Sequence, residues 1–177
     1  MKKINALVSV ALCFTAILHA VSFSGCIMGI IPYFPFLNIM GRITLTLLVI
    51  HIIISLCVFF FSNDSGVVGH YGFLNKSTII QRISAIAMMI LVHVHLIGGF
   101  FGKDGAPDQP LKTILCIFEI LFLASICLHI SLSVPKALIT LGLTQKEKTI
   151  NASKKISYVF IALVFLFCLI GTAVYVL

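Results

Sequence analysis

Charged residues are scarce in this sequence: only 10% of its 177 residues are Asp, Glu, Lys or Arg, while 60% are hydrophobic. A soluble domain of this size needs a more strongly charged surface, so the composition excludes a soluble globular protein. Apolar runs of about 20 residues are long enough to cross a lipid bilayer as helices. The sequence therefore predicts an all-α integral membrane protein.

Acidic residues are rarer than basic ones. There are five Asp and Glu against twelve Lys and Arg, which gives a formal net charge of +7. Such a balance can indicate a nucleic-acid-binding protein. Here, however, the basic residues lie in short links between apolar runs, where they set membrane topology. We therefore exclude nucleic acid as a partner and expect the lipid bilayer instead.

The sequence also lacks any paired cysteine motif. Its six cysteines are scattered, mostly inside apolar segments, and no two form a CxxC. Disulfide frameworks and structural zinc sites need paired spacings, so we interpret these cysteines as small packing residues. They are Cys13, Cys26, Cys57, Cys116, Cys127 and Cys168.

Hydropathy predicts a single transmembrane domain that covers residues 1–177 and contains five helices. Their expected bounds are 4–23, 36–62, 78–100, 111–134 and 155–177. The links between them carry the Gly, Pro, Asn and Asp that favour turns. The first span follows two lysines and resembles a signal peptide. Because Leu18-His19-Ala20 is a poor cleavage site, we expect this span to remain as a helix.

The distribution of Lys and Arg predicts the orientation. With the N-terminus in the cytoplasm and the C-terminus outside, nine basic residues lie inside and three outside, as the positive-inside rule requires. The predicted location is the cell membrane. The inner set is Lys2, Lys3, Lys76, Arg82, Lys136, Lys146, Lys148, Lys154 and Lys155, and the outer set is Arg42, Lys103 and Lys112.

Histidines occur in four consecutive spans, at His19, His51, His95 and His129, with His93 beside His95. At about 1.5 Å per residue, His19 and His95 lie roughly 23 Å from the cytoplasmic side, in the outer half of the bilayer. His51 and His129 lie in the inner half by the same count. The sixth histidine, His70, falls in a link and is interpreted as a solvated residue. The depths thus predict an outer pair and an inner pair.

Two facing imidazoles at one depth, on different helices of a bundle, can be the axial ligands of a haem iron. An unpartnered imidazole in hydrocarbon costs free energy, and ligation removes that cost. The competing interpretation is that these histidines make hydrogen bonds between helices. Spacing alone leaves both interpretations open. Since the sequence has no CxxCH, any haem is expected to be a noncovalent b-type haem.

A ligand histidine also needs an acceptor for the proton on its second ring nitrogen. Thr15 lies four residues before His19 and Ser125 four before His129, so each hydroxyl or carbonyl shares a helix face with its imidazole. For His51 and His95 the residues at that spacing are leucines, Leu47 and Leu91. There a backbone carbonyl is the expected acceptor.

Three stretches resemble the cytochrome b membrane anchor of succinate dehydrogenases and fumarate reductases, in its five-helix, two-haem form. Residues 81–95 (QRISAIAMMILVHVH) resemble the family's run that leads to a ligand histidine, and its spacing selects His95 over His93. Residues 129–143 (HISLSVPKALITLGL) resemble the segment that begins at the fourth ligand. Residues 154–166 (KKISYVFIALVFL) resemble the start of the fifth helix. The likeness covers nearly the whole chain.

The resemblance implies two haem b groups, an inner one held by His51 and His129 and an outer one held by His19 and His95. It also implies a flavoprotein and an iron–sulfur subunit on the cytoplasmic face, with electrons passing between that face and membrane quinone, menaquinone being expected. In such a complex this chain is an electron-transfer and quinone-reactive subunit and does not itself act on the dicarboxylate. His93 remains the alternative to His95 as ligand.

The chain departs from the family at three places, each occupied by small residues. Ser84-Ala85 stands where the family commonly has Thr-Gly, and Ser55 and Ser133 stand where it has Gly four residues after a ligand. Glycines beside haem let the macrocycle approach the backbone, and serine is small enough that we expect it to be tolerated.

Four charged residues in or near the spans also need explanation. A carboxylate inside a membrane is costly and usually functional, so Glu119 is a candidate for proton transfer at an outer quinone site, together with Arg42. The alternative is an ion pair between Glu119 and Arg42, or a contact of Arg42 with a haem propionate. Arg82 and Lys136, at the cytoplasmic ends of their helices, would meet inner-haem propionates or an acidic partner, or else only set topology.

Two other functions remain open at this stage. One is the cytochrome b subunit of another quinone-linked dehydrogenase, although such subunits tend to place two ligands on one helix. The other is a haem-free membrane transport or assembly protein in which the histidines are structural.

Overall fold

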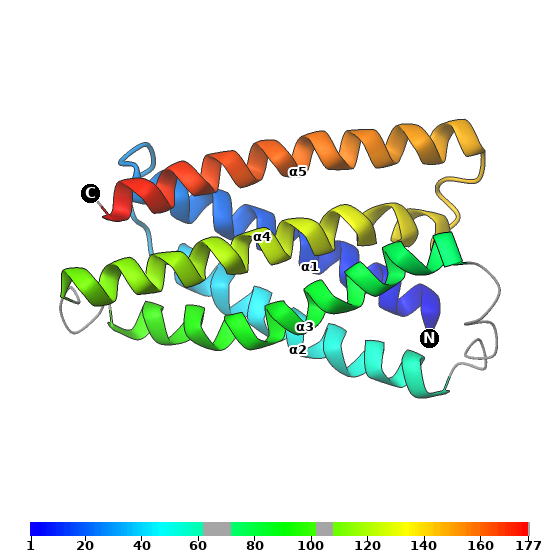
Figure 1. Cartoon of the computed structure of the whole chain (residues 1–177), viewed down its shortest axis with the longest axis horizontal. Coiled ribbons are helices and arrows are strands. Elements are labelled where there is room, and N and C mark those ends of the chain that lie inside the picture. The colour runs from blue at the N-terminus through cyan, green and yellow to red at the C-terminus, as the bar shows by residue number, and fades with distance from the viewer. Residues whose placement is uncertain (62–71, 102–107, 177) are drawn as a thin grey trace.

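The computed structural model describes residues 1–61, 72–101 and 108–176. Two residues discussed above, His70 and Lys103, lie outside these ranges. The described residues form five α-helices: α1 (Lys2–Ile27), α2 (Phe36–Phe61), α3 (Gly72–Phe101), α4 (Gln109–Thr140) and α5 (Glu147–Val176). Figure 1 shows them as a bundle of long helices with the two termini at opposite ends.

The predicted fold class is confirmed. Each of the five helices contains a segment long and apolar enough to cross a membrane. A helix satisfies its own backbone hydrogen bonds, which is why apolar sequences of this length adopt it in lipid. The chain is a multi-pass membrane protein.

Four helices, α1, α3, α4 and α5, extend beyond the bounds that the hydropathy pattern predicted. α4 continues to Thr140, past the buried Pro135, although the apolar span was expected to end at residue 134. Proline removes one backbone hydrogen bond, and membrane helices tolerate this loss where neighbouring elements compensate. α5 begins at Glu147, eight residues earlier than expected, and its first turns carry exposed lysines. Hydropathy detects only the apolar part of such a helix.

Four of the helices, α2, α1, α4 and α3, pack in this order and form a ring that is open between α2 and α3. α1 packs against α2 and α4, and α4 packs against α3. The remaining side, between α2 and α3, is bridged by Arg82, whose guanidinium carbon lies 5.1 Å from the centroid of the Phe59 ring. α1 and α3 are therefore opposite each other in the ring, and so are α2 and α4. Among the described residues neither opposite pair is in extensive contact.

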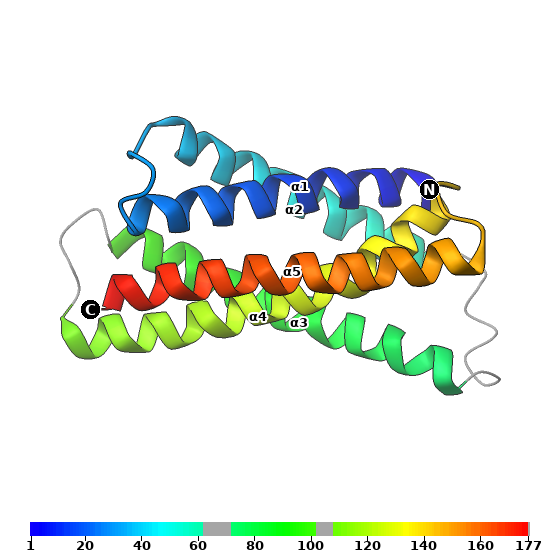
Figure 2. The same ribbon diagram turned by 90° about the horizontal axis from the view of Figure 1, so that it is seen from above.

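The fifth helix lies outside this ring. α5 packs against α1 and α4, on the side away from α2 and α3, as the two views in Figures 1 and 2 show. A Cβ atom added at Gly171 of α5 would lie only 2.8 Å from the Ser24 Cβ of α1. Small residues thus let these two helices approach closely, as is common between membrane helices.

Burial is uneven across the bundle. α4 has buried residues along most of its length, whereas the buried residues of α2 are Leu37 and Met40, both near its start. The middle of α2, which contains His51, is therefore only half-buried by protein. Lipid or another molecule must cover the rest of this apolar helix.

Candidate functional site

The four predicted ligand histidines come from the four helices of the ring, and α5 supplies none. His19 of α1 and His95 of α3 are close enough to interact electrostatically. The same is true of His51 on α2 and His129 on α4. Each pair thus joins helices on opposite sides of the ring. The two imidazoles of each pair therefore lie within electrostatic range of each other across the bundle.

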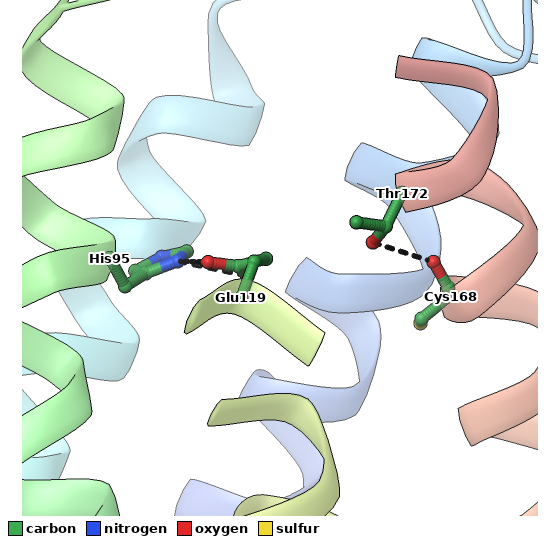
Figure 3. Close-up of polar contacts among 4 residues, drawn as sticks. All are labelled: His95, Glu119, Cys168 and Thr172. Carbon is green, nitrogen blue, oxygen red and sulfur yellow. Dashed lines mark hydrogen bonds and ion pairs between the residues drawn. The ribbon is translucent and has the colours of Figure 1, made fainter. Parts of the chain in front are cut away.

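His95 is held by a carboxylate from the neighbouring helix. Its Nδ1 lies 2.8 Å from Oε2 and 3.0 Å from Oε1 of Glu119, and Figure 3 shows the two side chains pointing toward each other from α3 and α4. A carboxylate accepts hydrogen bonds, so Nδ1 carries the proton and Nε2 is left with its lone pair. The Phe122 ring, at 5.1 Å between centroids, packs beside the imidazole.

His129 is held by α3 in a similar way. Its Nδ1 lies 3.1 Å from the Gln81 carbonyl oxygen and 3.3 Å from the Ser84 hydroxyl. The Ser84 hydroxyl itself donates to the Gln81 carbonyl at 2.9 Å, so it is free to accept from the imidazole. A carbonyl can only accept, and therefore Nδ1 of His129 is also the protonated nitrogen. Its Nε2 keeps an available lone pair.

His19 and His51 have less support from the protein. In the part of the chain that the structure describes, the buried Nδ1 of each has no hydrogen-bond partner of good geometry, although the His19 ring lies near the Leu37 backbone. The His19 ring lies against α2, where a Cβ added at Gly41 would come within 3.1 Å of its Cε1. Glycine at this position leaves room for the ring beside the helix backbone. A buried polar atom without a hydrogen-bond partner costs free energy, so each such atom needs an explanation.

The acceptors predicted for the second ring nitrogens are wrong. The Thr15 hydroxyl donates to the Leu12 carbonyl, and the Ser125 hydroxyl donates to the Leu121 carbonyl. Such hydroxyls can still accept, but Nδ1 of His129 bonds to Gln81 and Ser84 instead, and among the described residues Nδ1 of His19 has no hydrogen-bond partner. His95 bonds to Glu119 rather than to the Leu91 carbonyl that we expected.

The predicted ion pair between Glu119 and Arg42 is also wrong. Among the described residues the ionic partner of Glu119 is His95. Arg42 is exposed on α2, and its backbone carbonyl accepts a hydrogen bond from Thr46. A shared depth in the membrane does not identify the ionic partner of Glu119, because depth does not determine which helix faces are in contact.

His93 lies on a different face of α3 from His95. Its side chain is exposed, and its Nδ1 lies 2.7 Å from the Met89 carbonyl of the same helix. Residues two apart on a helix point in different directions, so only one of the two can face the ring interior. In this structure His95 faces Glu119 and His93 faces outward.

A polar network surrounds Gln81 near the end of the bundle that holds the N-terminus. The Lys136 ammonium donates to Gln81 Oε1 at 2.6 Å, and Gln81 Nε2 donates to the Ser133 hydroxyl at 2.7 Å. Arg82 lies close enough to Lys136 to interact with it electrostatically. Two positive charges therefore stand together at one end of α3 and α4.

The three serines that replace the residues expected from the family resemblance all make hydrogen bonds. Ser84 bonds to Gln81 and His129, and Ser133 accepts from Gln81. Ser55 of α2 donates to Asn5 of α1 at 3.1 Å. Sequence reasoning assigned no role to Gln81 or Asn5. The available indication was that each is an uncharged polar residue in an otherwise apolar span, where such residues usually bond across helices.

An open groove of about 470 Å³, which no histidine lines, lies between α1 and α5. Only apolar side chains line it, among them Phe14, Leu18 and Phe167. It contains no group that ligates a metal or carries a proton, so it is suited to a hydrocarbon chain of lipid.

The described residues contain no group of three or more His, Cys, Asp or Glu side chains placed to hold a bare metal ion. Axial ligation of haem needs only two side chains for each iron. No family model, curated protein or solved structure matches the chain. A functional assignment must therefore rest on the site itself.

Proposed function

We propose that the chain is a dihaem cytochrome b that anchors a soluble oxidoreductase to the cell membrane and passes electrons between it and quinone. The soluble part would be a flavoprotein and an iron–sulfur subunit of the succinate dehydrogenase or fumarate reductase type, on the cytoplasmic face. The N-terminus would lie inside and the C-terminus outside. This chain would carry electrons and react with quinone, expected to be menaquinone, and would not act on the dicarboxylate.

One observation carries this proposal: the histidines come in two pairs, and each pair spans opposite helices of the four-helix ring. Structural hydrogen bonds usually join adjacent helices, as Gln81 and Ser133 do here. Two imidazoles that meet across the interior are suited to a flat ligand that lies between them. Haem, with one axial site on each face, has this shape.

The residues present fit such a group. Nδ1 of His95 and Nδ1 of His129 each donate to an oxygen acceptor, which leaves Nε2 of both as a base for iron. His19 and His51 would also bind iron through Nε2, but among the described residues the Nδ1 of each lacks the oxygen acceptor that His95 and His129 have. Gly41 lets the His19 ring pack directly against the backbone of α2.

In this proposal His19 and His95 hold the outer haem and His51 and His129 hold the inner one. The haem supplies one-electron chemistry, which no side chain of this protein can supply. The chain fixes the depth of the two ligand pairs and excludes water from them. Arg82 and Lys136 place positive charge where the propionates of the inner haem, or an acidic partner surface, would be met.

One alternative has an observation in its favour. The bond between His95 and Glu119 would suit a haem-free transport or assembly protein equally well, since a buried imidazole and a carboxylate can stabilise a membrane bundle by themselves. That function predicts a colourless protein. It gives no reason, however, for the second pair, in which His51 and His129 lie on opposite helices within electrostatic range of each other.

The proposed function is tested with quinol as electron donor. The full chain, with any subunits that co-purify, is placed in lipid nanodiscs and mixed anaerobically with a water-soluble menaquinol analogue. We expect the absorption bands of reduced haem b to appear, since quinol delivers electrons to a quinone-reactive cytochrome. The same sample without quinol is the control. Haem that dithionite reduces but quinol does not would contradict the quinone-linked function.

A further inference from the structure

Glu119 is an acidic residue in the middle of an apolar helix. It lies on α4, in a segment whose mean hydropathy identifies it as a membrane span. Its side chain is 36% exposed in the isolated chain, and that of His95 is 35% exposed. A carboxylate at such a position is expensive, so a specific partner is expected to account for it.

Both oxygens of this carboxylate are aimed at one nitrogen. Oε2 and Oε1 lie 2.8 Å and 3.0 Å from Nδ1 of His95, a geometry typical of a charge-assisted hydrogen bond. His19, the proposed partner of His95, is close enough to interact electrostatically with both residues. Glu119 thus adds a negative charge beside the outer pair, while its own hydrogen bonds go to His95.

The inner pair has no such charge. His129 donates to a neutral carbonyl and lies near a neutral hydroxyl, and the Nδ1 of His51 has no partner among the described residues. Lys136, which lies within electrostatic range of His129, has the opposite sign. The two pairs therefore have the same ligand type in different electrostatic surroundings.

We propose that Glu119 is a positioning residue that fixes the tautomer and ring orientation of His95 and lowers the reduction potential of the outer haem. The inference rests on the proposed function. A carboxylate that accepts the Nδ1 proton makes Nε2 a stronger donor, which favours ferric over ferrous iron. Its negative charge acts in the same direction, because reduction adds an electron to the site.

The test is a redox titration of the purified full chain, followed by optical absorbance, in wild type and in the variants Glu119→Gln and Glu147→Gln. Glutamine keeps an oxygen that can accept from Nδ1 but removes the charge. We expect the midpoint potential of the outer haem to rise in E119Q, while that of the inner haem stays at its wild-type value. E147Q removes an exposed carboxylate at the start of α5 and should shift neither potential.

The outcomes separate this inference from the proposed function. A wild-type protein without haem would end both. Two haems with an unchanged outer midpoint in E119Q would overturn the inference alone. If E119Q loses the outer haem, the variant Glu119→Asp is measured next. Recovery of the outer haem in Glu119→Asp supports the positioning role of the carboxylate. Failure to recover it shows that Glu119 is a packing residue and overturns the proposal.

Discussion

Replacing His129 with leucine is expected to lower the haem content from two to one per chain and to remove the inner low-spin component. His129 supplies one of the two axial nitrogens of the proposed inner haem, and leucine has no lone pair to replace it. His51→Leu should remove the same component, because both imidazoles belong to one pair. The measurement is haem per polypeptide, together with the low-temperature absorption and paramagnetic resonance spectra of the oxidised protein.

This result should not depend on a loss of folding. The bonds from Gln81 to Ser133 and from Lys136 to Gln81 join α3 and α4 without His129. Circular dichroism and size-exclusion chromatography of the variants should therefore match wild type. If His51→Leu and His129→Leu removed different spectral components, the assignment of the pairs would be wrong.

Replacing His95 with leucine is expected to remove the outer component, whereas His93→Leu should leave both components and two haems per chain. His95 faces Glu119 inside the bundle, while His93 is exposed and bonds to the carbonyl of Met89 in its own helix. The two histidines lie two residues apart in similar sequence, so each variant is the matched control of the other. The same spectra and haem ratio measure both.

His19→Leu should reproduce the spectrum of His95→Leu, since these two imidazoles form the outer pair. The account would be contradicted if His93→Leu lost the outer component and His95→Leu kept it. That result would show that the other face of α3 points toward the haem.

Much of the fold could be predicted from the sequence because membrane helices are determined by long apolar runs. All five spans were found, including the first, which resembles a signal peptide. The errors fall at the ends. α5 begins with polar turns from Glu147, and α4 passes through Pro135, and in both places the helix extends beyond the region that hydropathy detects.

The depth of each histidine in the bilayer follows from the constant rise per residue of a helix and stays a prediction. The partners of the second ring nitrogens could not be predicted from the sequence. The acceptor of His129 is the backbone carbonyl of Gln81. Every residue has a backbone carbonyl, so the residue type does not indicate which carbonyl accepts. The partner of His95 is Glu119, on a helix face that only the packing of α3 against α4 defines.

The most direct measurement is a dithionite-reduced minus oxidised spectrum of the purified wild-type chain, combined with the ratio of noncovalent haem to polypeptide. We expect the bands of a b-type cytochrome and a ratio of two. A colourless, iron-free protein, produced in cells with ample porphyrin and folded as the five-helix bundle, would contradict the claim that the paired imidazoles hold haem.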